Sequence, residues 1–126
     1  MAIRSATETS RCSITERHAA GLVVSALNGS ERQVAFLAGQ LQERGVPGWL
    51  VDSLCRAPWW PATDDDRLDV ITMFAARLTQ APQSVAAVHV DRLRAVGLTD
   101  GQIHELVNVV SYYNCLNRMT AGLGLN

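Results

Sequence analysis

The sequence of 126 residues contains no lysine, and all eleven of its basic residues are arginine. A protein without lysine cannot use a side-chain amine to form a Schiff base with a carbonyl substrate. Acidic and basic residues nearly cancel, and the formal net charge is −1. No strong field of one sign therefore predicts binding to nucleic acid or to a membrane surface, and we expect neither partner.

Long apolar segments and paired cysteines are also missing. No apolar run approaches the roughly 18 residues that a membrane-spanning helix needs, and no charged-then-apolar leader precedes Ser13. Cys12, Cys55 and Cys115 lie far apart, with neither CxxC nor metal-ligand spacing. Isolated thiols of this kind are typical of a reducing compartment. We expect a cytoplasmic protein with no metal site and no cofactor.

Helix-start signals are what the sequence does contain. Ser13 with Glu16, and Thr99 with Gln102, form capping boxes, in which each side chain satisfies a backbone N–H group of the other end. They predict helices that begin directly after Ser13 and Thr99. The last helix carries apolar residues at steps of three and four: Ile103, Leu106, Val107, Val110, Tyr113 and Leu116.

Four more helices are predicted between these two. Ser30, Thr63 and Ser84 are the expected N-caps of the second, fourth and fifth helices. Pro47 is expected at the first position of a short third helix, where proline costs no hydrogen bond. The residues expected to anchor that helix are Trp49, Leu50, Val51 and Leu54. The first helix is apolar on most sides between positions 19 and 27, which predicts that other helices surround it.

The expected fold class is all-α, because no strand pattern or internal repeat is present. About six helices should form one domain over residues 13–126, preceded by a flexible N-terminal arm over residues 1–12. Hydrophobic residues make up 48% of the chain and charged residues only 18%. A subunit interface would account for this excess, so we expect a homo-oligomer.

Four segments carry a family resemblance over residues 13–125. The chain resembles a carboxymuconolactone decarboxylase-type domain, in the branch with AhpD-like alkylhydroperoxidases and peroxidase-related proteins. The matching segments are SALNGS (25–30), LQERGVP (41–47), FAARLTQAPQSV (74–85) and LRAVGLTDGQIHELVNVVSYYNCLNRMTAGLGLN (93–126). The resemblance implies an AhpD-like helical fold whose subunits assemble as trimers or hexamers.

The redox residues of that family are absent from this chain. The resemblance places the family's two redox cysteines at Ser30 and Gln33, its histidine at Leu37 and its glutamate at His18. An imidazole that some members carry between the cysteines falls at Arg32. The decarboxylase branch keeps a histidine that also falls at Leu37. We therefore expect no thiol peroxidase activity, and the decarboxylase chemistry is not inherited intact.

A polar set remains where the family's site would lie. We predict His18, Ser30 and Gln33 as catalytic residues, with His18 shuttling a proton. The predicted ligand-binding residues are Arg32, Leu37, Trp60, Tyr113 and Asn117. A structural interpretation stands beside this one. In this interpretation Ser30 caps a helix, and Arg32 and His18 are surface residues. Trp59 and Trp60 cover a core edge or an interface, and the segment around Tyr113 packs against other helices.

Two functions from different classes follow. The first is a non-redox enzyme with a remodelled pocket, which performs cyclisation, isomerisation or decarboxylation of a small organic molecule in specialised metabolism. The second is a non-catalytic oligomeric pseudoenzyme that acts as a small-molecule-binding or scaffold protein. We favour the enzyme because polar groups at Ser30 and Gln33 are costly to bury unless they are satisfied.

Overall fold

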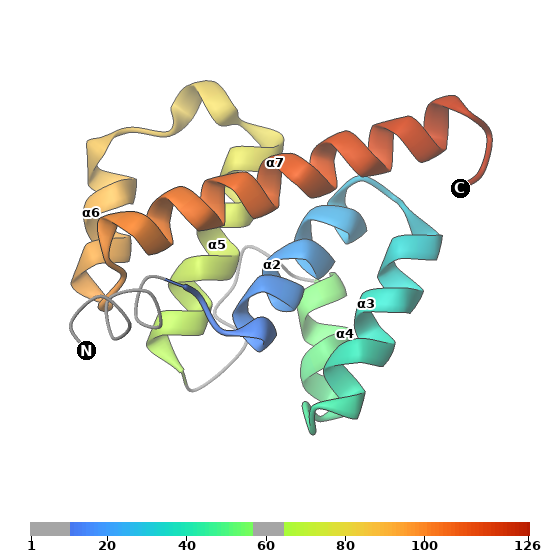
Figure 1. Ribbon diagram of the computed structural model, residues 1–126, viewed down its shortest axis with the longest axis horizontal. Helices are drawn as coiled ribbons and strands as arrows, with labels where there is room; N and C mark the ends of the chain where they lie inside the picture. The colour runs from blue at the N-terminus through green and yellow to red at the C-terminus, as the bar shows by residue number, and fades with distance from the viewer. Residues whose placement is uncertain (1–10, 57–64) are drawn as a thin grey trace, which may run out of the picture.

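The computed structural model describes residues 11–56 and 65–126, which are entirely helical (Figure 1). Within these ranges the six α-helices and one 3₁₀ turn are α2 (Ile14–Leu27), α3 (Glu31–Glu43), α4 (Gly48–Arg56), α5 (Asp66–Gln80), η1 (Pro82–Ser84), α6 (Ala87–Ala95) and α7 (Asp100–Gly122). The all-α prediction is confirmed for the described residues. The predictions for Thr63 and Trp60, and for the first ten residues of the arm, lie outside them.

Helix α2 is the centre of the fold. Residues 19–25 are buried without interruption, so this helix presents no continuous polar face to solvent. A helix that is apolar all round must be enclosed by other elements. Helices α3, α4, α5 and α7 all pack against α2, which is the blue helix in the middle of Figure 1. The predicted enclosure of the first helix is confirmed.

Two apolar clusters meet along α2. The first joins one side of α2 to α5, α6 and α7, and it includes Ala20, Val24, Ile71, Phe74, Leu93, Leu106 and Val110. The second joins the other side to α3, α4 and α5, and it includes Leu22, Val23, Leu37, Leu41, Val51, Leu54 and Leu68. Tyr113 packs against both clusters. This side chain therefore stands where the two halves of the core meet.

Helices α2 and α7 run in the same direction along each other. Later residues of the first segment contact later residues of the second. The Ser25 hydroxyl donates to Asn117 Oδ1 at 3.3 Å, and further along both segments the Asn126 amide donates to the Gly29 carbonyl at 3.0 Å. Helix α7 is the longest, with 23 residues, and its C-terminal part extends beyond the other helices in Figure 1. Its N-terminal part contacts α5 and α6.

The local start signals are confirmed at both ends of the chain. Both capping boxes form, with Ser13 Oγ accepting from the Glu16 N–H at 3.1 Å and Thr99 Oγ1 accepting from the Gln102 N–H at 3.2 Å. A capping box needs only residues three apart in sequence, so tertiary packing does not have to assemble it.

Two predicted starts need correction. Helix α5 is capped by Asp65, whose side chain accepts from the Leu68 N–H, so the helix starts later than the predicted cap Thr63, which itself lies outside the described residues. Ser84 ends the 3₁₀ turn, and its hydroxyl donates to the Ala81 carbonyl at 2.7 Å instead of capping a helix. The fifth predicted helix, α6, starts only at Ala87. The hydroxyl of Ser84 is used for the turn, and the helix begins after a second extended residue.

The segment around α4 and the end of the predicted arm also differ from expectation. Pro47 precedes α4, and its carbonyl accepts from Leu50 and Val51 N–H groups, so it lies one position before the helix. Trp49, predicted as an anchor of this helix, is 64% exposed, whereas Val51 and Leu54 are buried. In contrast, Cys12 is buried against α7, so the last residues of the expected arm are ordered by packing. None of the described helices is long and apolar enough to cross a membrane.

Candidate functional site

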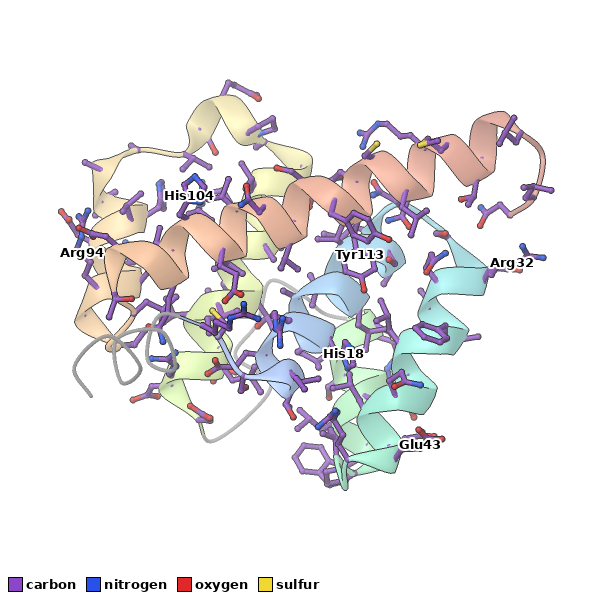
Figure 2. All side chains as sticks on the ribbon, viewed as in Figure 1. His18, Arg32, Glu43, Arg94, His104 and Tyr113 are labelled. Carbon is purple, nitrogen blue, oxygen red and sulfur yellow. The ribbon has the colours of Figure 1, made fainter. Side chains whose placement is uncertain are left out.

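A groove with a volume of about 610 Å³ lies between α2 and α7. Its lining residues are Ile14, Arg17, His18, Arg44, Glu105, Asn108, Val109, Tyr112 and Tyr113. Figure 2 labels His18 on α2 and Tyr113 on α7, and both residues line this groove. The volume falls in the range of small-molecule sites.

Helical spacing explains why these residues meet. Positions 14, 17 and 18 of α2 are three and four apart, and positions 105, 108, 109, 112 and 113 of α7 follow the same steps. Residues at these steps share one face of a helix. The groove is therefore the space between one face of α2 and one face of α7, and Arg44, just after α3, adds its guanidinium at the side.

Tyr113 packs against α2 beside His18. A Cβ atom at Gly21 would lie 2.6 Å from Tyr113 Cε2, so the ring lies directly on the helix backbone at this glycine. Gly21 is three residues after His18 and shares its face. The Tyr113 ring also meets Tyr112 edge to face, with 5.1 Å between centroids. Burial raises the pKa of Tyr113, so its hydroxyl is protonated at neutral pH and can donate a hydrogen bond.

The groove carries more positive than negative charge. Arg17 and Arg44 line it against a single carboxylate, Glu105. Glu105 is already engaged, because it accepts from the Cys12 N–H and lies 4.0 Å from an Arg17 Nη atom. Arg44 makes no ion pair or side-chain hydrogen bond with any residue that the structure describes. An anion would therefore meet a guanidinium group with free donors.

Unpaired polar atoms concentrate on the α2 side of the groove. Among the described residues, four buried side-chain polar atoms have no hydrogen-bond partner, and two of them are Arg17 Nε and His18 Nδ1. Such atoms are rare in folded proteins and each calls for an explanation, such as a bound water or a functional role. Burial, and then the positive charges of Arg44 and Arg17, lower the pKa of His18. The imidazole is therefore neutral at pH 7.

The predicted catalytic set is not assembled around His18. Helix α2 rises about 13 Å from His18 to its last residue, Leu27, and Ser30 lies beyond that end. Ser30 is 1% exposed, its hydroxyl has no partner among the described residues, and it makes no side-chain cap bond to α3. Ser30 occupies the N-cap position of α3, as predicted, but its side chain makes no cap hydrogen bond, and it does not line the groove at His18. Gln33 is half-buried on the first turn of α3 and does not line the groove.

The predicted ligand-binding residues also do not lie together in the groove. Tyr113 lines the groove, whereas Leu37 is fully buried in the second apolar cluster. Asn117 is buried one turn beyond Tyr113 and accepts from Ser25, while its own Nδ2 has no partner in the described chain. Arg32 is exposed at the outer end of α3, where Figure 2 shows it pointing away from the helices. Trp60 lies outside the described residues.

Sequence reasoning missed Arg17, Arg44 and Glu105. The spacing signal was nevertheless present, since Arg17 precedes His18 and Glu105 lies two helical turns before Tyr112 on the α7 face. What the sequence did not indicate is that these two faces oppose each other.

The thiols and the metal-binding residue types are scattered. Burial, and then the nearby charges of Glu105 and Glu16, raise the pKa of Cys12 to about 11. Burial also raises the pKa of Cys55, and Cys115 is exposed on α7. Within residues 11–56 and 65–126, no three His, Cys, Asp or Glu side chains are placed to hold a metal ion.

In the described residues, five α-helices and one 3₁₀ turn accompany the buried helix α2 in an all-α fold. Among solved structures, the fold is similar to that of an uncharacterized peroxidase-related protein from Silicibacter sp. TM1040, with a TM-score of 0.79 and 25% sequence identity. The match covers 87% of this chain and 57% of that chain, so the present chain spans little more than half the length of its neighbour. No protein-family model and no curated protein matches the sequence. The structural likeness supports the family resemblance seen in the sequence, and it does not bear on the loss of the redox pair.

Proposed function

We propose that this protein is a cofactor-independent, non-redox enzyme that performs acid–base chemistry on a small organic anion in the groove between α2 and α7. The reaction class is cyclisation, isomerisation or decarboxylation, as expected for a member of the family without its thiols. One observation carries the proposal. His18 is a partly buried imidazole flanked by Arg17 and Arg44 in a groove of small-molecule size.

The two arginines bind the substrate anion. Guanidinium groups hold carboxylates through two parallel hydrogen bonds, which fixes the orientation of the bound anion as well as its position. Arg44 has all of its donors available within the described chain, and Arg17 shares its charge with Glu105 at 4.0 Å. The protonated Tyr113 hydroxyl is the third donor. These groups favour an organic anion over a neutral molecule of the same shape.

His18 supplies the proton transfer. Its lowered pKa keeps the imidazole neutral at pH 7, so that it can accept a proton from a carbon atom next to a carbonyl or carboxylate group. The imidazolium that forms returns the proton to another atom of the same molecule, which completes an isomerisation or a cyclisation without any external oxidant. Binding of the anion between the arginines offsets the positive charges that disfavour this imidazolium.

A dithiol peroxidase mechanism has little support in the same structure. A peroxidatic cysteine needs a thiolate at neutral pH and a second thiol within reach. The pKa of Cys12 is about 11, and its neighbours include two carboxylates that oppose ionisation. Cys55 and Cys115 lie on α4 and α7. We therefore propose that the protein does not consume hydroperoxides through a cysteine pair.

The second candidate is a non-catalytic binding or scaffold protein. It is favoured by the fate of the family's site positions, because Leu37 is enclosed in the apolar core and Ser30 is buried without a partner in the described chain. The groove then binds a small molecule without transforming it. We propose a homo-oligomer for both candidate functions. It is supported by exposed apolar residues on α7 and just after its end, namely Tyr112, Met119, Leu123 and Leu125.

The deciding experiment combines binding with turnover. A panel of small carboxylates, with their neutral amides as controls, is screened by ¹H–¹⁵N NMR for shifts of groove residues, and each hit is tested for conversion. His18→Gln should retain binding but reduce conversion by about 10²-fold or more, the usual contribution of a general acid or base. His104→Gln, at an exposed histidine of α7, is the matched control and should leave conversion unchanged.

Three outcomes separate the candidates. Binding without conversion of any hit favours the non-catalytic protein. Conversion that survives His18→Gln places the chemistry on other residues. No groove shift with any carboxylate overturns the anion preference and with it the enzyme as proposed.

A further inference from the structure

A second cavity, of about 360 Å³, lies between α5 and α6 and shares no lining residue with the groove at His18. Its lining residues are Val70, Met73, Phe74, Arg77, Gln80, Ala81, His89 and Arg92. On α5, positions 70, 73, 74 and 77 follow steps of three and four, so they form one helix face. This face and the first turns of α6 enclose a pocket at the lower limit of small-molecule sites.

The wall of this cavity on α5 is apolar. Phe74 is buried and belongs to the first core cluster, and Val70 packs against that cluster. Met73, one position before Phe74, is 38% exposed, which leaves its thioether uncovered within the described chain. Methionine side chains adapt to apolar groups of different shape and are common at binding surfaces. The wall is therefore suited to an aliphatic or aromatic group.

The rim of the cavity is cationic. Arg77 and Arg92 line it, and none of its lining residues is acidic. Arg92 makes no ion pair or side-chain hydrogen bond with any described residue. Two positions further along α6, Arg94 is paired with Asp91 and Asp100, each at 3.0 Å. The guanidinium that is left uncompensated is thus the one that lines the cavity.

His89 adds an oriented hydrogen-bond donor to this rim. Its Nδ1 accepts from the Ala86 N–H at 3.0 Å. A neutral imidazole that accepts at Nδ1 carries its proton on Nε2, which is therefore a donor. Partial burial, and then the charges of Arg77 and Arg92, lower the pKa of His89, which agrees with both guanidinium groups being near the ring. Arg77 also donates one hydrogen bond to Ser84 Oγ at 3.1 Å, which holds it at the cavity.

We propose that the cavity between α5 and α6 is a second ligand site, which binds a small amphipathic carboxylate. The apolar part of the ligand packs on Val70, Met73 and Phe74, and its carboxylate accepts hydrogen bonds from Arg77, His89 and Arg92. The site is independent of the proposed chemistry at His18, because the two sites share no lining residue.

The test uses hexanoate as the probe and hexanol as its neutral counterpart, with the full chain in low-salt buffer. Binding is followed by ¹H–¹⁵N NMR shifts and by calorimetry. Hexanoate should bind at least about tenfold more tightly than hexanol, since hydrogen bonds to a charged group are about twice as strong as neutral ones. Arg77→Gln and Arg92→Gln should each weaken hexanoate binding by about tenfold, the effect of one lost charged hydrogen bond.

Arg94→Gln is the matched control, because it removes the same charge from the same helix outside the cavity. It should leave the affinity for hexanoate unchanged, and all three variants should keep the parent's circular dichroism spectrum. Arg92→Lys, which keeps the charge, should recover part of the lost affinity and guards against a structural effect of the glutamine.

Each contrary result overturns the proposal in a distinct way. Equal binding of hexanol shows that the rim charge plays no part. An equal loss in Arg94→Gln shows a general charge effect instead of a site. Hexanoate that shifts no residue of α5 or α6 at millimolar concentration shows that there is no site. If Met73→Asp instead converts a sedimenting oligomer into monomers and hexanoate has no effect, the cavity is covered by a second copy of the chain.

Discussion

The ring of Tyr113 lies against the backbone of Gly21, in the space that a side chain at position 21 would fill. A Cβ atom built there would be 2.6 Å from Tyr113 Cε2 and 2.9 Å from Cδ2, closer than real Cβ contacts. This glycine therefore sets how closely α7 approaches α2. It also places Tyr113 one helical turn from His18, on the same face of α2.

The first prediction follows from that contact. Gly21→Ala should force the Tyr113 ring or α7 to move and should lower the free energy of unfolding by about 1–3 kcal/mol, the usual cost of overpacking. Gly39→Ala is the matched control, since Gly39 lies in α3 with nothing within 4 Å of its built Cβ. It should instead stabilise by about 0.5–1 kcal/mol through helix propensity. Urea denaturation of both variants measures the difference, and an equal effect would show that the contact is not tight.

The second prediction contrasts two buried serines. Ser25 donates to Asn117 Oδ1, so Ser25→Ala should leave that buried acceptor unpaired and cost about 1–3 kcal/mol. The Ser30 hydroxyl has no partner among the described residues, so Ser30→Ala should leave the free energy of unfolding unchanged or raise it. If Ser30 capped α3 through its side chain, its loss would cost about 1 kcal/mol instead. Thermal and urea denaturation of the two variants decides between these cases.

The residues at helix starts illustrate which contacts could be predicted from the sequence. The capping boxes at Ser13 and Thr99 were predicted correctly because donor and acceptor lie within one helical turn. Ser30 carries the same type of signal at the start of α3, but its side chain is enclosed where α2 ends, and no cap bond forms. Propensity identified the position of the helix start and could not identify the orientation of one hydroxyl, which tertiary packing decides.

The candidate site, too, could be predicted only in part, because its assembly depends on tertiary packing. His18 and Tyr113 were both nominated, and both line the groove. Leu37 was nominated because a family pattern carries function at that position, whereas packing in this chain depends on residue type, and leucine joins the core. Arg44 follows the end of α3 and reaches the groove only because α3 runs back along α2. A single sequence gives the faces of helices, but not which faces oppose each other.

The third prediction concerns the ion pair between Glu16 and Arg67. Arg67 Nε donates to Glu16 Oε2 at 2.7 Å, and both side chains are less than one-third exposed. Although burial acts to raise it, hydrogen bonds from Arg67 and from the Ser13 backbone hold the pKa of Glu16 below its usual value of 4.5. A lowered carboxyl pKa stabilises the folded protein above the unfolded pKa, and this contribution is lost as the pH falls through the folded pKa.

Glu16→Gln should therefore be destabilised by about 1 kcal/mol at pH 7, with a smaller difference from the parent at pH 3. Glutamine retains the hydrogen bond to the Ser13 N–H, so the change isolates the ion pair. Asp91→Asn, in an exposed pair with Arg94, is the control and should change stability little at either pH. A difference between Glu16→Gln and the parent that stays constant from pH 7 to pH 3 would contradict the assignment.

The fourth prediction tests the proposed homo-oligomer. Met119, in the last turn of α7, is 57% exposed, and Leu123, directly after that helix, is 70% exposed. Large exposed apolar groups that lie together are typical of interaction surfaces. Sedimentation at micromolar concentration should show a trimer or a hexamer, and Met119→Asp should reduce the mass. Phe36→Asp, at a residue of equal exposure on α3, is the control and should leave the mass unchanged. A monomeric parent would refute the proposal.

The last prediction concerns the protonation of His18. Burial is the largest cause of its lowered pKa, followed by the charges of Arg44 and Arg17, so NMR titration should give a value below the ordinary 6.5. Because the unfolded chain binds the proton more readily, His18 contributes stability above pH 6.5 that is lost as the pH falls through the folded pKa. Arg44→Gln removes the charge that lowers this pKa more than Arg17 does, and it should raise the pKa of His18 without bringing it to 6.5, since burial remains. Arg32→Gln, at the opposite end of α3, should leave it unchanged. A bound carboxylate should raise the same pKa by offsetting both arginines. If Arg44→Gln and Arg32→Gln have equal effects, the guanidinium of Arg44 does not act on the imidazole, and the groove lacks the electrostatic arrangement on which its proposed acid–base chemistry depends.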